Sequence, residues 1–225
     1  MTFNLPHYQP EDYAYFITTR LTGTIPKIVF EKIKNEYEQN LKHLDGYKCS
    51  KTKKEKYREL QKTKFNKYEK ILDTCKYGHK WLGDSKVAKI VDQAFHYYDG
   101  AKYDLIAYTI LPNHIHLVIF PIVERKSSFA QKDINNQYIQ NESGDSFYIL
   151  SKIMQDIKKF TAKEANKVLN RKGKFWQNEN YDHVVRDEQE LRRIVKYILN
   201  NPVKAGLCEV ADEWKWNYFN AKYLI

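Results

Sequence analysis

The sequence predicts an α+β fold, in which an antiparallel sheet has helices packed on one face and is joined by a basic helical insertion. The order of apolar patterns along the chain is strand, helices, strand, strand, helix, strand, helix, which is typical of this layered class. A chain of 225 residues is long enough for one domain, 1–225, with an insertion at about 27–80. That insertion holds fifteen Lys and one Arg against eight Asp and Glu.

The first strand and the insertion are defined by a sharp change in composition. Residues 13–21 are rich in aromatic and β-branched side chains and predict a strand. Residues 31–75 contain frequent Lys, Glu, Tyr and Leu, no Pro and a single Gly, which predicts two helices broken near Asp45-Gly46. A solvated helical hairpin would explain this charge run, and a nucleic-acid contact is the alternative.

The middle of the chain returns to ordinary core patterns. Residues 84–98 have apolar side chains at helical spacing, with Asp84 or Ser85 as the N-cap. Residues 103–110 and 116–120 are apolar enough for two strands, joined by a Leu-Pro-Asn-His turn. Residues 124–146 are polar and lack periodicity, so we expect a loop there.

The last third predicts two helices with a strand between them. A helix follows the loop and has an apolar face from Leu150 to Phe160. Phe175-Trp176 and residues 183–185 are short candidates for strand pairing near the sheet edge. A final helix covers about 188–200, with Asp187 and Glu190 spaced like a capping box, and Pro202 ends it.

Charge and composition narrow the possible functions. The 38 Lys and Arg exceed the 28 Asp and Glu by ten, a common footprint of nucleic-acid binding, although anionic membranes and ribosomes also attract such charge. No apolar run is long enough for a membrane span and no secretory signal is visible, so we expect a cytoplasmic protein that does not bind membranes. Three widely spaced cysteines match neither a zinc site nor a disulfide framework.

The strongest local motif is His114-Ile115-His116 at the start of an apolar strand. Residues two apart on a strand point to the same face, so both imidazoles can reach one metal ion while Ile115 packs on the other side. Two strand-end histidines in ordinary hydrogen bonds are the alternative. Histidine-triad hydrolases would need a third His at Val118, and two-histidine phosphoesterases would need two H-x-Thr/Ser motifs, so the sequence weakens both alternatives.

The second motif lies on the last helix. Its apolar residues recur at i, i+3, i+4, i+7 and i+8 from Leu191 to Leu199 and form a packed stripe. Tyr197 falls on the flank of that stripe, and Asn201 lies one turn later on the same side. Boundary packing would explain Tyr197 considered alone, because the chain contains 18 tyrosines.

Taken together, these segments resemble the REP-associated tyrosine transposases, relatives of the small single-tyrosine insertion-sequence transposases, which are HUH endonucleases. The resemblance covers about residues 8–24 and 81–220 and omits the insertion. Its motifs agree in type, order and spacing, and they are Leu111-Pro-Asn-His-Ile-His-Leu-Val-Ile119, Phe175-Trp-Gln177, Tyr181-Asp-His-Val-Val-Arg186, Tyr197-Ile-Leu-Asn-Asn-Pro-Val-Lys-Ala-Gly-Leu207 and Trp214 to Tyr218.

The resemblance implies a ferredoxin-like HUH core and a role for each matching residue. His114 and His116 match the pair that binds the catalytic Mg²⁺ or Mn²⁺, and Tyr197 matches the nucleophile. Asn201 matches the polar residue that completes the metal site, although better-known members have Gln there. His183 or a metal-bound water is a candidate general base. The expected DNA contacts are Lys152, Lys158, Lys159, Lys163, Arg186, Lys204 and Trp176.

The implied activity is that of a DNA transposase that cleaves and rejoins single-stranded or hairpin-bearing DNA through a covalent 5′-phosphotyrosine, on mobile or repeated palindromic elements. A sequence-specific nucleic-acid-binding regulator with the same fold and without cleavage activity is the alternative. The intact His114, His116, Tyr197 and Asn201 favour the enzyme, since a pure binder needs none of them. Both a monomer and a homodimer are compatible with the sequence.

Overall fold

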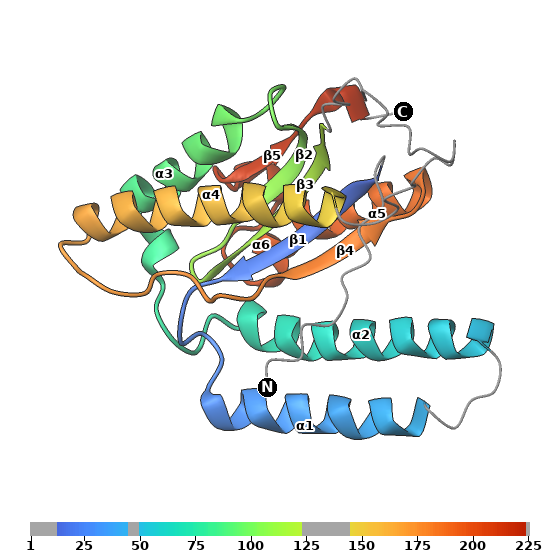
Figure 1. Ribbon diagram of the computed structural model, residues 1–225. Coiled ribbons are helices and arrows are strands. Elements are labelled where there is room, and N and C mark those ends of the chain that lie inside the picture. The colour runs from blue at the N-terminus through green and yellow to red at the C-terminus, as the bar shows by residue number, and fades with distance from the viewer. Residues whose placement is uncertain (1–12, 45–49, 123–144, 224–225) are drawn as a thin grey trace, which may run out of the picture.

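A five-stranded antiparallel sheet forms the centre of the computed structural model, which describes residues 13–44, 50–122 and 145–223 (Figure 1). Its strand order is β4-β1-β3-β2-β5. The predicted α+β class is confirmed, and one strand, β5, was missed because it is only three residues long. The strands are β1 (Ala14–Arg20), β2 (Tyr103–Ile110), β3 (His114–Pro121), β4 (Tyr181–Val185) and β5 (Asn217–Phe219).

One face of the sheet carries the helices α3 (Ser85–Tyr97) and α4 (Asp145–Val168). Side chains of successive strand residues alternate between the two faces, and Tyr15, Ile17 and Ile115 point to this one. They form the larger core with the apolar stripes of α3 and α4, including Phe95 and Ile157. The Asp84 side chain caps α3 by accepting a hydrogen bond from the backbone of Lys86, at 2.8 Å.

The opposite face is also covered, which corrects the expectation of helices on one face. Helix α5 (Glu188–Leu199) packs its apolar stripe there, with Val195 and Ile198 against Phe16 and Val118 of the sheet. The stripe was recognised in the sequence, but periodicity does not tell which face of a sheet a helix covers. The chain then turns into the short helix α6 (Asn201–Lys204), where Pro202 occupies the first turn.

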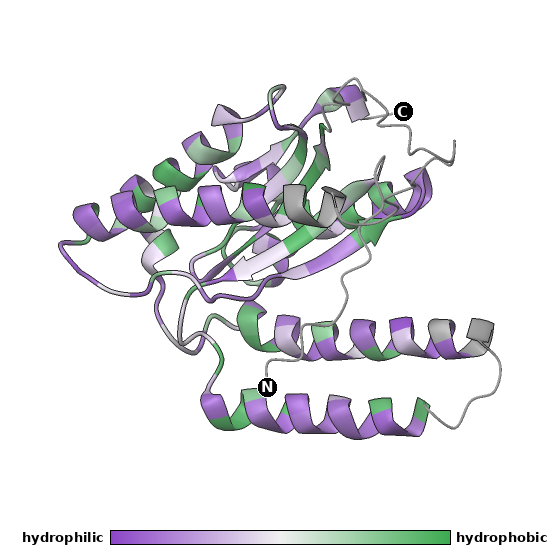
Figure 2. Cartoon of the chain, in the orientation of Figure 1, coloured by the Kyte–Doolittle hydropathy of each residue, from purple (hydrophilic) through white to green (hydrophobic). Residues whose placement is uncertain are grey.

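The insertion forms an antiparallel hairpin of two long helices, α1 (Lys27–Leu44) and α2 (Ser50–Asp73), beside the sheet (Figure 1). The predicted break near Asp45-Gly46 lies outside the described residues, between the last residue of α1 and the first of α2. Figure 2 shows the hairpin as largely hydrophilic, in contrast to the apolar strands. Even so α2 contacts the sheet, because Phe65 packs edge-on against Phe16 and stacks on Tyr181 at 3.8 Å between ring centroids.

The two ends of the hairpin meet at a close approach of backbones. Gly78 has φ +72°, and a Cβ at this position would lie 2.6 Å from the carbonyl oxygen of Gly23. Only glycine fits such a contact without displacing the chain. The insertion therefore leaves the sheet layer and rejoins it at adjacent points.

The remaining described segments are short. None of the helices within the described ranges has both the length and the apolar character that a membrane crossing requires. The expected loop at 124–146 lies almost wholly outside the described residues. Three 3-10 helices complete the fold, at Trp81–Gly83, Ala211–Glu213 and Ala221–Tyr223.

Candidate active site

The two histidines of β3 lie on the face of the sheet covered by α5 and α2, and both are fully buried. Their Nε2 atoms are 3.2 Å apart, while Ile115 between them packs into the opposite core. The strand alternation therefore brings both imidazoles to one point, as expected. At this distance the two Nε2 atoms cannot both carry a hydrogen directed at the other.

Hydrogen bonds behind the rings fix their orientation. Asn113 donates through Nδ2 to the carbonyl of Leu72, so its Oδ1 faces His114 and accepts a hydrogen bond from Nδ1, at 2.6 Å. His114 therefore keeps a lone pair on Nε2. The Nδ1 of His116 lies 2.8 Å from the hydroxyl of Thr18, its cross-strand partner on β1. Such outer partners commonly orient metal-binding histidines.

The charge state of His114 also suits ligation. Burial, followed by the neighbouring His116, lowers the pKa of His114 to about 3. The ring is consequently neutral near pH 7, and a neutral imidazole is the form that binds metal ions.

Tyr197 and Asn201 reach the same point from α5 and α6. The ring of Tyr197 lies 5.5 Å from that of His116, and the Nδ2 of Asn201 lies 3.1 Å from His116 Nε2. The Oδ1 of Asn201 is buried without a hydrogen-bond partner. The structure therefore brings together the four residues His114, His116, Tyr197 and Asn201 that the sequence singled out.

A fifth residue, Glu69 of α2, was not predicted. Its Oε2 lies 3.1 Å from His116 Nε2 and accepts a hydrogen bond from the hydroxyl of Tyr197. Glu69, His114 and His116 each offer one ligand atom, and these atoms lie within 4.8 Å of one another. This buried group could bind a metal ion.

The carboxyl group of Glu69 and the phenol of Tyr197 shift each other's ionisation. Burial acts to raise the pKa of Glu69, but its contacts with His116, His114 and the Tyr197 hydroxyl outweigh burial, so the pKa falls below its usual value. Burial, followed by the charge of Glu69, raises the pKa of Tyr197 far above its usual value. In this arrangement a carboxylate accepts from a protonated tyrosine.

A sequence signal for Glu69 existed. Phe65, Glu69, Leu72 and Asp73 follow one another at i, i+4, i+7 and i+8, the spacing of one helical face. In a helix crowded with lysines, two acids on the apolar face indicate burial with a partner. The composition of the insertion as a whole concealed this local pattern.

His183, the candidate base, has another partner in the structure. Its Nε2 lies 3.0 Å from the Oε1 of Glu190, whose other oxygen accepts from the backbone of Arg186. Glu190 thus lies in the first turn of α5, as the capping-box spacing predicts. Its carboxylate, however, accepts from the backbone of Arg186, one residue before the N-cap residue Asp187. The hydroxyl of Tyr197 meets Glu69 instead.

The lysines expected on α4 divide into two kinds. Lys159 and Lys163 are exposed, and Lys152 forms an exposed ion pair with Asp156. Lys158 instead turns inward, and its ammonium group donates to the carbonyls of Gln177 and Asn178 and to the side chain of Asn180. Burial, followed by nearby cations, lowers the pKa of Lys158 to about 8. We therefore assign Lys158 to holding the 177–180 segment.

The other expected DNA contacts also differ in exposure. Trp176 is 5% exposed and its indole nitrogen donates to Thr161 at 2.9 Å, so this conformation leaves it no surface for stacking on a base. Its bridge to Leu21 extends the sheet edge instead. Arg186 is exposed, while Lys204 bonds to Asp73 of α2.

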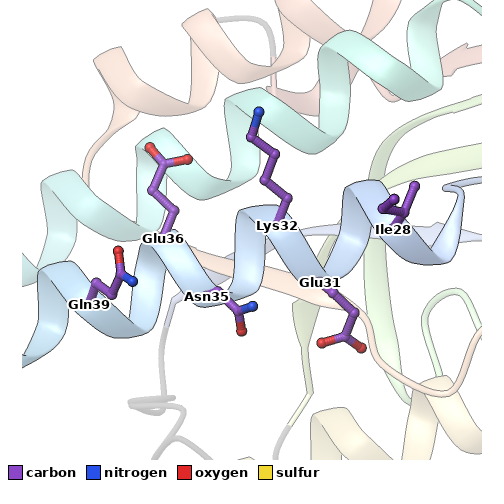
Figure 3. A pocket seen from close by; sticks show the side chains of 6 residues that line it. All are labelled: Ile28, Glu31, Lys32, Asn35, Glu36 and Gln39. Atoms are coloured by element: carbon purple, nitrogen blue, oxygen red, sulfur yellow. The ribbon is translucent and has the colours of Figure 1, made fainter.

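A hollow also lies on the surface of α1, away from the residues of the histidine cluster. Its lining consists of Ile28, Glu31, Lys32, Asn35, Glu36 and Gln39, all on this one helix (Figure 3). Both signs of charge occur there, so it shows no preference for an anion.

Comparisons with known proteins agree with this fold. No family model matches the chain. A putative REP-associated tyrosine transposase of Haemophilus influenzae is 27% identical over 118 residues, which are 52% of this chain and 60% of that protein. The match thus spans about three fifths of the relative's length. A solved structure of a REP-associated tyrosine transposase bound to a REP hairpin has 15% identity and a TM-score of 0.51, and the match covers 96% of this chain and 82% of that one.

The fold is thus an α+β arrangement like that of the solved transposase, built on a five-stranded antiparallel sheet. The chain is a homologue of REP-associated tyrosine transposases, in sequence over half its length and in fold over nearly all of it. The resemblance drawn from the motifs is confirmed.

Proposed function

We propose that this protein is a metal-dependent DNA endonuclease and strand transferase that acts on single-stranded or hairpin-bearing DNA of mobile or repeated palindromic elements. The observation that carries the proposal is the convergence of Tyr197 with His116, His114 and Asn201 at one buried point. The hairpin in the homologous structure supports the choice of DNA form. A binding protein without cleavage activity has no use for this arrangement.

Phosphodiester cleavage needs charge neutralisation and an in-line nucleophile. A divalent ion, Mg²⁺ or Mn²⁺, held by His114 and His116 with Asn201, would neutralise a non-bridging oxygen of the phosphate. The donors fit this role, since the Nε2 of His114 offers a lone pair and the Oδ1 of Asn201 has no partner. Thr18 and Asn113 keep the rings aimed at the same point.

Tyr197 supplies the nucleophile. Its oxygen attacks phosphorus, the bond from phosphorus to the 3′ oxygen breaks, and the products are a 5′-phosphotyrosine and a free 3′-OH. A tyrosine hydroxyl ordinarily has a pKa of ~10, and burial followed by the charge of Glu69 raises the pKa of Tyr197 further, so this hydroxyl needs a proton acceptor. The carboxylate of Glu69 already accepts the hydrogen bond from this hydroxyl, so it is better placed for that task than His183. Attack by a second 3′-OH reverses the reaction and joins strands without an external energy source.

The decisive experiment is capture of the covalent adduct. A 3′-labelled oligonucleotide, folded as a hairpin from inverted repeats that flank the gene, is incubated with protein and Mg²⁺ and separated on a denaturing gel. We expect a labelled band of protein size with wild type. Tyr197→Phe removes one hydroxyl, keeps the packing and should eliminate the band.

Tyr181→Phe is the matched control. Tyr181 stacks on Phe65 at the same site, and burial raises its pKa as it raises that of Tyr197. The hydrogen bond to Glu69, however, comes from Tyr197. Loss of the band only with Tyr181→Phe would transfer the nucleophile to that residue. Cut DNA without any adduct would indicate a metal-dependent hydrolase. DNA binding without cutting would favour the nucleic-acid-binding regulator.

A further inference from the structure

We propose that Glu69 binds the metal ion together with His114 and His116, so that the helical insertion completes the metal centre. The inference rests on the metal site proposed above and changes its composition. It assigns a role to a segment that the family motifs leave out.

The burial of Glu69 needs an explanation. It is 3% exposed, on a helix that is otherwise Lys-rich and hydrophilic (Figure 2). Its Oε1 is buried without a hydrogen-bond partner, although a buried carboxylate oxygen left unpaired costs at least about 1–3 kcal/mol. A side chain at the surface of the hairpin would avoid this cost. A bound cation would offset it.

Several potential ligand atoms lie close together around Glu69. Glu69 Oε2, which accepts from the Tyr197 hydroxyl, and His114 Nε2 lie 3.1 Å and 3.2 Å from His116 Nε2, and all three side chains are buried. Lone pairs this close repel one another unless a proton or a cation lies between them. A divalent ion relieves the repulsion among all three at once, whereas one proton can bridge only two.

Charge balance favours Glu69 over Asn201 as the stronger ligand. Two neutral imidazoles and one amide would leave a buried divalent ion without a compensating anion, which is costly in a low-dielectric site. Glu69 supplies one negative charge, and Mg²⁺ and Mn²⁺ prefer carboxylate oxygens. The other nearby acid, Asp73, is already paired with Lys204.

Three contacts hold α2 so that the carboxylate keeps its position. Phe65, one turn before Glu69, packs against Phe16 and Tyr181. Asp73, one turn after it, pairs with Lys204 of α6. Asn113 links the carbonyl of Leu72 directly to the ring of His114. A ligand and its helix are thus fixed on three sides, which is the preorganisation that a metal site requires.

The test is Mn²⁺ binding by the metal-free full-length protein, measured by calorimetry or by loss of the free Mn²⁺ electron-spin signal. Glu69→Gln keeps the shape of the side chain and removes its charge, so we expect affinity to fall more than about 10-fold. Glu59→Gln, at an exposed position of the same helix, is the matched control and should bind as wild type does. Equal affinity of Glu69→Gln and wild type overturns the inference.

A second variant reports ligation directly and guards against a mere loss of folding. Glu69→Cys with Co²⁺ should develop a thiolate-to-cobalt charge-transfer absorption that Glu59→Cys lacks. Bound Co²⁺ without this absorption also overturns the inference. His116→Ala distinguishes failure of this inference from failure of the proposed function. If neither wild type nor His116→Ala binds Mn²⁺, the proposed function fails. If His116→Ala loses binding while Glu69→Gln keeps it, only the role of Glu69 is rejected.

Discussion

At the scale of single residues, the site depends on side chains that do not touch substrate. Thr18 and Asn113 hold the two imidazoles from behind, and each forms its hydrogen bond within the buried core. Without these partners the rings could rotate about their side-chain bonds, and their Nε2 atoms would no longer converge. The sheet register, which places Thr18 opposite His116, is therefore part of the chemistry.

Replacement of Thr18 by Val tests this positioning role. The variant keeps the branched shape and removes the hydroxyl that lies 2.8 Å from His116 Nδ1. We expect Mn²⁺ affinity to fall by about 10-fold or more, as is usual for outer-shell partners. Thr19→Val is a matched control, because Thr19 is equally buried, faces the other side of the sheet and has no hydrogen-bond partner for its hydroxyl. Calorimetric titration of both variants provides the comparison, and equal affinities would remove Thr18 from the metal centre.

The sequence could predict the site residues that lie in short motifs. His114, His116, Tyr197 and Asn201 lie within short segments whose spacing alone determines which of them share a face. Glu69 is 45 positions before His114 and on a separate helix; the local period indicates that it is buried, but its approach to the histidines depends on tertiary packing. The positions of Trp176 and Lys158 depend on tertiary packing in the same way. Their residue types suit DNA contact, but partners distant in the sequence bury them.

At the scale of elements, the hairpin is anchored by a backbone contact rather than by a large apolar interface. Gly23 and Gly78 touch at its base, and α2 adds a few contacts near its C-terminal end. The rigidity of this base determines where Glu69 lies.

Gly78→Ala should therefore affect both stability and metal binding. The substituted residue must adopt φ +72° and place a Cβ 2.6 Å from the Gly23 carbonyl oxygen, so the two chain segments must separate. We expect a loss of about 1–3 kcal/mol, seen as a melting temperature lower by several degrees, together with weaker Mn²⁺ binding.

Gly100→Ala provides the control for backbone strain alone. Gly100 has φ +75° but nothing within 4 Å of the added Cβ. Its variant should lose less stability and keep wild-type metal affinity. Equal losses in the two variants would show that the contact between Gly23 and Gly78 contributes nothing beyond the unfavourable φ.

Most elements agreed with their predicted residues because their periods are unambiguous. The helix at 85–97 and the strands at 103–110 and 114–121 lie within a few residues of expectation. The three-residue β5 has too few residues for any alternation to show, and it is defined by its pairing with β2. Which face α5 covers is likewise a tertiary property.

At the scale of the whole molecule, positive charge is unevenly distributed. Residues 27–80, which include the hairpin of α1 and α2 beside the sheet, contribute eight of the ten excess charges (Figure 1). DNA that enters the site from this side would meet a basic surface. Exposed Lys159 and Lys163 of α4 form a second basic group.

Salt dependence of hairpin-DNA binding measures how many of these charges contact phosphate. We expect a steep log–log slope for wild type, which decreases by about 0.7–0.9 for each contact removed. Neutralising the exposed hairpin residues Lys32, Lys62 and Lys70 to Gln should flatten the slope, and so should the change of Lys159 and Lys163. These substitutions leave Glu69 and the docking contacts intact, which deletion of the hairpin would not.

Lys86 and Lys89 on α3 form a matched pair that removes the same charge as the α4 substitutions from another helix. Their neutralisation should change the slope less than that of Lys159 and Lys163. A slope unaffected by the hairpin substitutions would restrict the hairpin to the metal centre.

The contact between Gly23 and Gly78 also has a consequence for inheritance. Because the hairpin departs and returns at touching backbones, a gene could lose residues 24–77 in one deletion and still encode every strand of the sheet. A chain without these residues would also lack the acid at 69, so His114, His116 and Asn201 would have to hold the metal ion without it. Among related genes, the hairpin and an acidic residue at this position should therefore be kept or lost together.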